Sequence, residues 1–210
     1  MQAEDSPPYS RCMTTSKPNS RFAELQEVLD DHLFEAWQGD CWRFQTISYP
    51  SGREILGGLG AFTHGGRWNA PGIFPVVYGS TTEEVALLES KAHDHYFGIV
   101  TRNARIFVCI GFKLSRVLDL TRVGTLARLG LAAADLLAED WRKIQASGYE
   151  SLTQCVGRAA FDAGVEGLVT ASGAVENGKN VAYFPDNFAF GSSVILYDEA
   201  ALQDMGKFKL

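Results

Sequence analysis

A single glutamate stands out as a candidate for chemistry because its neighbours predict an apolar helix face. Residues from about 84 to 96 follow a helical period, and at about 100° per residue Glu89 falls on an apolar stripe. The other members of that stripe are Val85, Leu88, Ala92 and Tyr96. A carboxylate in such a face must bind a partner or change its pKa. Glu89 is therefore either a functional carboxylate or half of a structural ion pair with a buried arginine.

The sequence lacks the motifs of several familiar nucleotide-binding and hydrolytic enzymes. The glycine-rich segment 51–72 contains neither G-x-G-x-x-G nor G-x-x-x-x-G-K-[ST], so neither a Rossmann site nor a P-loop is predicted. No G-x-S-x-G nucleophile elbow occurs in the chain. His93 and His95 flank Asp94, but residues two apart on a helix point to different faces. Since the sequence has no other cluster of ligands, we predict no metal site.

Composition and charge narrow the class of protein further. The chain has 210 residues, 46% of them hydrophobic, which is enough for one domain with its own core. A net charge of -6 argues against nonspecific binding to nucleic acid or to an anionic membrane. Cys12, Cys41, Cys109 and Cys155 have no regular spacing, which predicts free thiols in a reducing compartment. Without a secretory signal or an apolar run of about 20 residues, we expect a cytoplasmic protein that does not enter membranes.

The first part of the chain combines one long predicted helix with a long loop. Hydrophobic residues at helical spacing predict a helix over residues 21–37, capped by Asn19 or Ser20. A glycine-rich loop follows over residues 51–72, and long ordered loops are more often functional than not. A short strand is then predicted over residues 75–78.

The helix that carries the glutamate should begin in a capping box. Either Thr81 with Glu84 or Ser80 with Glu83 has the required spacing. Beyond this helix, strands are predicted at 105–112, 117–120, 167–171, 180–184 and 194–197, and helices at 126–141 and 152–163. This order does not alternate regularly enough for a doubly wound parallel sheet. We therefore predict an α+β fold, a single mixed domain with a small central sheet flanked by helices.

The segment from Gly65 to Glu89, GGRWNAPGIFPVVYGSTTEEVALLE, resembles the RES-domain family of bacterial toxins. Known members of that family consume NAD or transfer its ADP-ribosyl group to a protein. The similarity extends over about residues 42–184 and includes Arg43, Arg67 in G-G-R-W-N, Tyr78 in V-V-Y, Glu89 in A-L-L-E, Ser172, and Asn180 and Phe184 in N-x-x-x-F. It implies an ADP-ribosyltransferase-like fold for a RES-like catalytic domain over residues 41–200. We expect a flexible tail over residues 1–20 and a helical extension over residues 21–40 to precede this domain.

The resemblance implies that NAD is the substrate and that Glu89, Arg67 and Tyr78 are catalytic. Cleavage of the nicotinamide–ribose bond passes through an oxocarbenium-like state, which a nearby carboxylate stabilises. Glu89 is the candidate for that role. Arg67 matches the NAD pyrophosphate because a guanidinium binds phosphate oxygens in a bidentate way. Tyr78 offers a flat face for nicotinamide and a hydroxyl that orients it.

The dinucleotide-binding residues that follow from the resemblance are Arg43, Arg67, Tyr78, Ser80 and Ser172. The two serines can hydrogen-bond a ribose hydroxyl or the carboxamide. Each residue also has a structural interpretation, since arginines are mostly exposed or structural charges. A tyrosine at the end of a strand is by default a half-buried core aromatic, and Ser172 on its own is a loop residue.

Three functional hypotheses remain open. The first is a toxin that transfers ADP-ribose from NAD to water or phosphate, and the second is a toxin that transfers it to a protein acceptor. The third is a noncatalytic module that binds a nucleotide or a partner. The resemblance also implies an antitoxin partner with a helix-turn-helix DNA-binding part. The acidic chain has no nucleic-acid motif, so we expect any DNA contact to come through that partner.

Overall fold

The computed structural model describes residues 16–46, 51–98 and 104–200. Most of the expected flexible tail, residues 1–15, therefore lies outside the described residues, as does Cys12. The last residues of that tail pair with the body of the domain. Lys17 N donates to Gly148 O (2.9 Å), and Glu150 N donates to Lys17 O (3.0 Å).

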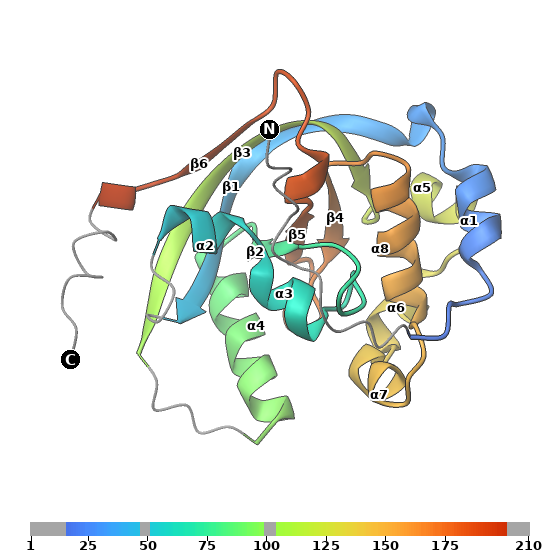
Figure 1. The fold of residues 1–210 in the computed structure, drawn as a ribbon, viewed down its shortest axis with the longest axis horizontal. Helices are drawn as coiled ribbons and strands as arrows, with labels where there is room; N and C mark the ends of the chain where they lie inside the picture. Colours follow the sequence, from blue (N-terminus) through green and yellow to red (C-terminus); the bar gives the residue numbers. More distant parts are fainter. Residues whose placement is uncertain (1–15, 47–50, 99–103, 201–210) are drawn as a thin grey trace, which may run out of the picture.

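The centre of the molecule is a sheet that closes on itself (Figure 1). Its strands are β1 (Phe34–Thr46), β2 (Val77–Ser80), β3 (Arg105–Asp119), β4 (Gly167–Ala171), β5 (Lys179–Tyr183) and β6 (Ser193–Leu196). Their order is β1-β2-β5-β4-β3-β6, and an additional β1–β3 pairing makes the sheet barrel-like. Only β3 and β4 pair in parallel. The prediction of a single mixed domain is confirmed, and the predicted small central sheet is a six-stranded, barrel-like one.

The closure depends on β1, a long strand whose first residues, 34–37, were predicted as the end of a helix. Helix α1 (Phe22–Val28) is followed by a 3-10 turn, η1 (Asp31–Leu33), and β1 begins at once. The prediction of one helix over residues 21–37 is wrong beyond Val28. β1 pairs with β3 from Phe34, opposite Leu118, along its whole length. This long-range pairing outweighs the local helical period, because tertiary contacts routinely override helix propensity.

Three other predicted segments differ in their detail. The loop over residues 51–72 contains α2 (Gly52–Leu56), begun by a Ser51–Glu54 capping box, and α3 (Leu59–His64). The predicted helix over residues 126–141 is three helices, α5 (Val123–Arg128), α6 (Ala133–Ala138) and α7 (Trp141–Ala146). The chain turns between α5 and α6 at Gly130, whose φ of +62° favours glycine. The two strands predicted over residues 105–120 are one continuous strand, β3.

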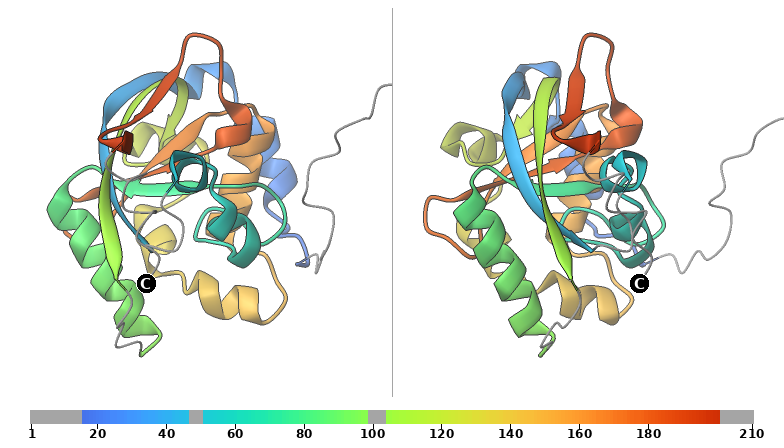
Figure 2. Two further views of the ribbon diagram at one scale, coloured as in Figure 1. Left: turned by 60° about the vertical axis from the view of Figure 1, so that its left-hand side comes forward. Right: turned by 90° about the vertical axis from the view of Figure 1, so that its left-hand side faces the viewer.

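Buried apolar side chains pack on both faces of the sheet. Along β3, alternate residues are buried on one face: Ile106, Val108, Ile110, Phe112 and Leu114. On the opposite face, α1 and α8 (Leu152–Asp162) lie side by side (Figures 1 and 2). Helix α8 brings Phe161 onto Phe74, with ring centroids 4.3 Å apart. The prediction of a helix over residues 152–163 is confirmed, and a Ser151–Gln154 capping box begins it.

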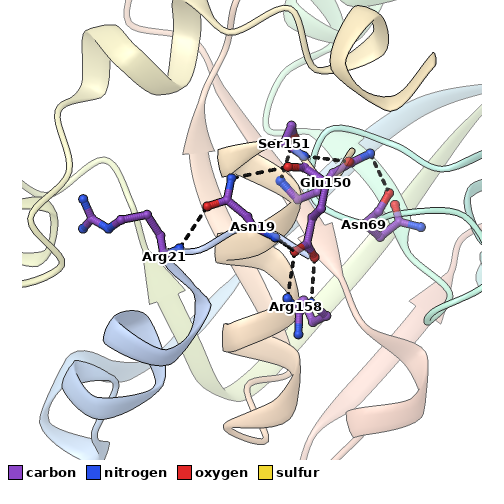
Figure 3. Close-up of polar contacts among 7 residues, drawn as sticks. Asn19, Arg21, Asn69, Glu150, Ser151 and Arg158 are labelled. Carbon is purple, nitrogen blue, oxygen red and sulfur yellow. Dashed lines mark hydrogen bonds and ion pairs between the residues drawn. The ribbon is translucent and has the colours of Figure 1, made fainter. Parts of the chain in front are cut away.

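A buried ion pair fastens the N-terminal segment to the start of α8 (Figure 3). The Glu150 side chain is 4% exposed and accepts hydrogen bonds from Arg158 Nε (2.6 Å) and Nη2 (2.7 Å). It also accepts from Asn19 N (2.9 Å). The Phe22 ring of α1 lies beneath the Arg158 guanidinium, whose Cζ is 3.4 Å from the ring centroid. These contacts hold residues 19–22 against the connection between α7 and α8.

We expect the substitution Glu150→Gln to lower the free energy of unfolding by about 3 kcal/mol, because it leaves a largely buried arginine without its paired charge. Urea denaturation of the purified variant measures this loss. Glu24→Gln is the matched control, because Glu24 pairs with Arg21 at a side-chain exposure of 67%. The control should cost less than about 1 kcal/mol. Equal losses in the two variants would show that burial adds nothing to the Glu150 pair.

Candidate functional site

Glu89 lies at the end of the second turn of α4 (Glu83–Tyr96), the helix that follows β2. Thr82 caps this helix, since its side chain accepts a hydrogen bond from Val85 N (3.2 Å). Both predicted capping boxes are therefore wrong. Ser80 is the last residue of β2, and Thr81 N still donates to Lys179 O (3.0 Å), so neither residue is free to cap the helix.

The Glu89 carboxylate is held through one of its two oxygens. Oε1 accepts hydrogen bonds from Ser172 Oγ (2.7 Å), Asn180 Nδ2 (2.7 Å) and Gly173 N (3.2 Å). All three donors are neutral. Within the described residues no Lys, Arg or His nitrogen lies within 4.0 Å of this carboxylate. The glutamate is thus not half of a close structural ion pair, which was the alternative to a functional role.

A second layer of hydrogen bonds fixes these donors. Asn180 Oδ1 accepts from Ser80 Oγ (2.7 Å), and the two residues face each other across the β2–β5 pair. Ser172 Oγ also accepts from Ala174 N (3.1 Å), at the turn that leads from β4 to β5. The structure therefore brings Ser172 to Glu89 directly and Ser80 to it through Asn180. Asn180 belongs to the N-x-x-x-F segment of the family resemblance, but it had no predicted role until strand pairing and its bond to Glu89 supplied one.

The G-G-R-W-N segment forms a rigid loop beside this cluster. Tyr78 Oη accepts from Trp68 N (2.9 Å) and donates to Asn69 Oδ1 (2.8 Å). The amide of buried Asn69 donates in turn to Ala61 O (2.8 Å) and Phe74 O (3.2 Å). The Tyr78 hydroxyl is thus occupied with holding the loop that carries Arg67. This geometry makes Tyr78 a positioning residue, with its ring the part that remains for a ligand.

We expect Tyr78→Phe to lower the free energy of unfolding by about 1–3 kcal/mol, because Trp68 N–H and Asn69 Oδ1 lose a partner in a buried place. Thermal and urea denaturation measure this effect. Tyr149→Phe, at an exposed tyrosine, is the matched control and should change stability little. A Tyr78→Phe variant as stable as the parent would contradict the positioning role.

Arg67 is the predicted site cation whose charge interacts with that of Glu89. Its Nη1 donates to Leu136 O (2.7 Å) and Glu139 O (3.4 Å), which fixes the guanidinium and leaves Nε and Nη2 as donors. Burial lowers the pKa of Arg67, and the negative charge of Glu89 is the largest effect that opposes this shift. Burial raises the pKa of Tyr78 well above its usual value, so the phenol stays neutral. The site therefore combines a fixed cation with a fixed carboxylate.

Arg43 does not join this cluster. It lies on β1, where Nη1 donates to Ile55 O of α2 (3.2 Å) and Nη2 donates to Gln45 Oε1 (2.9 Å). Burial alone lowers its pKa to about 10. Of the predicted site residues, hydrogen bonds join Ser172 directly and Ser80 through Asn180 to Glu89, Tyr78 holds the loop that carries Arg67, and Arg43 bonds to Ile55 O and Gln45.

Three further observations bear on the kind of site. Within residues 16–46, 51–98 and 104–200, no group of three or more His, Cys, Asp or Glu side chains is arranged to hold a metal ion. No helix of the described chain is both long and apolar enough to cross a membrane. A hollow of about 200 Å³ lined by Trp37, Lys113 and Leu114 contains none of the clustered residues. The candidate site is therefore defined by its polar contacts.

Comparisons with known proteins agree with this geometry. The RES domain family model matches residues 40–203, which confirms the resemblance. The chain is 29% identical over 167 residues to the NAD(+) phosphorylase MbcT of Mycobacterium tuberculosis (strain ATCC 25618 / H37Rv), covering 72% of this chain and 81% of that protein. The protein of the same name from Mycobacterium bovis (strain ATCC BAA-935 / AF2122/97) gives the same values.

A solved structure also has the same fold. The crystal structure of the M. tuberculosis MbcT-MbcA toxin-antitoxin complex matches with a TM-score of 0.59 and 22% sequence identity. The match covers 90% of this chain and 98% of that chain. At this identity the likeness establishes the arrangement of helices and strands.

Proposed function

The chain belongs to the RES domain family, and on that premise we propose that it binds NAD and cleaves the nicotinamide–ribose bond. The observation that carries this proposal is the Glu89 carboxylate, held on Oε1 by three neutral donors beside Arg67. The relative at 29% identity is named an NAD(+) phosphorylase, which supports the same substrate and bond. The ADP-ribosyltransferase-like character of the fold is part of this proposal.

The reaction requires a fixed negative charge near the ribose. As the bond between ribose C1 and the pyridinium nitrogen breaks, its electron pair goes to the nitrogen and nicotinamide leaves as a neutral molecule. Positive charge develops on the ribose, where a preorganised carboxylate stabilises it. Glu89 supplies that charge, because its Oε1 is anchored and its Oε2 has no hydrogen-bond partner among the described residues. Arg67 holds the pyrophosphate through Nε and Nη2.

Phosphate is the acceptor that we favour. An oxygen of hydrogen phosphate bonds to ribose C1 and keeps its proton on the phosphoryl group, giving ADP-ribose 1-phosphate and nicotinamide. Water gives ADP-ribose in the same way, with loss of one proton. Transfer to a protein side chain is the second candidate, which the RES family resemblance keeps open.

Product analysis tests this function. The purified protein is incubated with NAD in buffers with and without phosphate, and the products are identified by mass spectrometry. Phosphate-dependent formation of ADP-ribose 1-phosphate is the expected result, and ADP-ribose in both buffers would identify a hydrolase. Labelling of a protein in added cell extract would identify a transferase. NAD binding without any turnover would overturn the proposal in favour of a noncatalytic nucleotide-binding module.

We further propose that the chain is the toxin of a toxin–antitoxin pair. The support is the family and a solved structure of the same fold, whose title describes a toxin-antitoxin complex. The antitoxin would carry a helix-turn-helix part for DNA binding and would cover the site near Arg67 and Glu89.

Expression of the chain alone should arrest growth, because consumption of NAD harms the cell. Co-expression of the antitoxin should restore growth, and the purified complex should turn over little NAD. Colony counts and NAD assays on the free chain and the complex check both statements. A complex that cleaves NAD as fast as the free chain would show that neutralisation does not work by covering the site.

A further inference from the structure

A second arginine lies in an aromatic setting close to the proposed site. Arg142 belongs to α7, and its guanidinium lies over the rings of Trp141, Tyr96 and Phe97, at 4.4, 4.8 and 5.6 Å from their centroids. Nη2 lies 3.4 Å from His93 Nδ1. Since a guanidinium can only donate, Nδ1 is the acceptor in this contact. The Nε atom of Arg142 is buried and has no hydrogen-bond partner in the described chain.

The contacts of Arg142 place it along the same face of α4 as Glu89. His93 and Tyr96 follow Glu89 by four and seven residues, so the three side chains lie on one face of the helix. Tyr96 Oη donates to Asp140 Oδ1 (3.0 Å), which ties the start of α7 to α4. Arg142 therefore lies one to two helical turns beyond the glutamate, a displacement of roughly 5–10 Å along the helix axis.

Arg67, on the G-G-R-W-N loop, is bonded to the segment that directly precedes α7 and Arg142. Its Nη1 is bonded to Leu136 O and Glu139 O, three residues or more before Arg142. Burial lowers the pKa of Arg142, and the positive charge of Arg67 lowers it further. The carboxylate of Asp140 is engaged by Lys143 N (3.1 Å) and Tyr96 Oη. Across the described residues, neither Arg67 nor Arg142 forms an ion pair within 4.0 Å.

We propose that Arg142 and Arg67 together form a subsite for phosphate oxygens, with Arg142 as a binding residue of the NAD-cleaving site. Arg67 Nη1 is bonded to Glu139 O, three residues before Arg142, so the two guanidinium groups serve the same stretch of chain, and an anion with several oxygens can accept hydrogen bonds from both. The three aromatic rings surround the guanidinium and hold it by cation–π contacts, which leaves the unpartnered Nε as a donor for a ligand. This inference rests on the proposed function. The phosphate oxygens belong either to the NAD pyrophosphate or to the free phosphate that accepts ADP-ribose.

Steady-state kinetics of Arg142→Gln and Arg142→Lys test the proposal, with the KM for NAD and the KM for inorganic phosphate measured separately. We expect Arg142→Gln to raise one of the two constants about 10- to 100-fold, since a charge-assisted hydrogen bond is lost. Arg142→Lys should recover only part of it. A rise in the KM for NAD with an unchanged product ratio would show that Arg142 binds the NAD pyrophosphate. A rise in the KM for phosphate, with a shift of the product from ADP-ribose 1-phosphate to ADP-ribose, would show that Arg142 binds the acceptor phosphate.

Lys143→Gln is the matched control, because it removes the same charge from the neighbouring exposed residue and should leave both constants unchanged. If the parent cleaves NAD and Arg142→Gln keeps both constants within twofold, the subsite proposal is wrong. Calorimetry with ADP-ribose and with inorganic phosphate separates this outcome from failure of the proposed function. If the parent binds either probe through Arg142 but cleaves no NAD, the subsite proposal stands and the proposed enzymatic function is wrong. Equal binding of both probes by parent and Arg142→Gln overturns the subsite whatever the activity.

Discussion

Glu89→Gln is expected to lower kcat for NAD cleavage by at least about 100-fold, the scale set by loss of one preorganised electrostatic group. The amide keeps the shape of the side chain but removes the negative charge that faces the ribose. Its carbonyl oxygen can take the place of Oε1 and accept from Ser172, Asn180 and Gly173. Folding and most of the NAD affinity should therefore survive. Single-turnover kinetics with calorimetry of NAD binding measure the two effects separately.

The control for this substitution is Glu84→Gln, on an exposed position of the same helix, which should leave kcat unchanged. Full activity in Glu89→Gln would remove the carboxylate from the mechanism. A large fall in melting temperature, together with lost activity, would instead make Glu89 a structural residue. Retained NAD binding without turnover is the combination that the proposed function requires.

Arg67→Lys is expected to raise the KM for NAD by about 10- to 100-fold with a smaller change in kcat, because a lysine cannot reproduce the bidentate contact with phosphate oxygens. The structure sharpens this expectation. Nη1 of Arg67 is already used by Leu136 O, so the substrate depends on Nε and Nη2. A lysine has one nitrogen for both tasks and would satisfy the loop or the substrate but not both.

Arg43→Lys is the informative comparison for this prediction, because the hydrogen bonds of Arg43 go to Ile55 O and Gln45 and not to the Glu89 cluster. We expect it to affect stability more than the KM for NAD. Calorimetric titration with NAD distinguishes the two arginines. Equal losses of NAD affinity in both variants would show that Arg43 also binds NAD. An unchanged affinity in Arg67→Lys would show that Arg67 has a structural role only.

Local features of the sequence were sufficient to predict several elements. The helix that carries Glu89 follows from its helical period, although Val85 is the one member of the predicted stripe that is buried, and α8 has a clear period and ends just before Gly164. The strands β4 and β5 are short runs of β-formers between turn residues, and they occur within one residue of the predicted bounds. These signals are local, because helix periodicity, caps and turns depend on neighbours a few residues apart. The order and spacing of residues in the segment from Gly65 to Glu89 were also enough to suggest the RES family.

The tertiary structure alone decided how these elements meet. Residues 34–37 have a helical period but form part of β1, because pairing with β3 stabilises them more than a helix would. Asn180 hydrogen-bonds Glu89, which is 91 residues away in the sequence, and the Tyr78 hydroxyl is hydrogen-bonded to Trp68 N and Asn69 Oδ1. Arg43 and Arg67 are the same residue type in one family pattern, yet Arg43 bonds to Ile55 O and Gln45 whereas Arg67 bonds to Leu136 O and Glu139 O. Contacts of this kind leave no periodic trace in the sequence, since they depend on strand register and on which side of the sheet each residue faces.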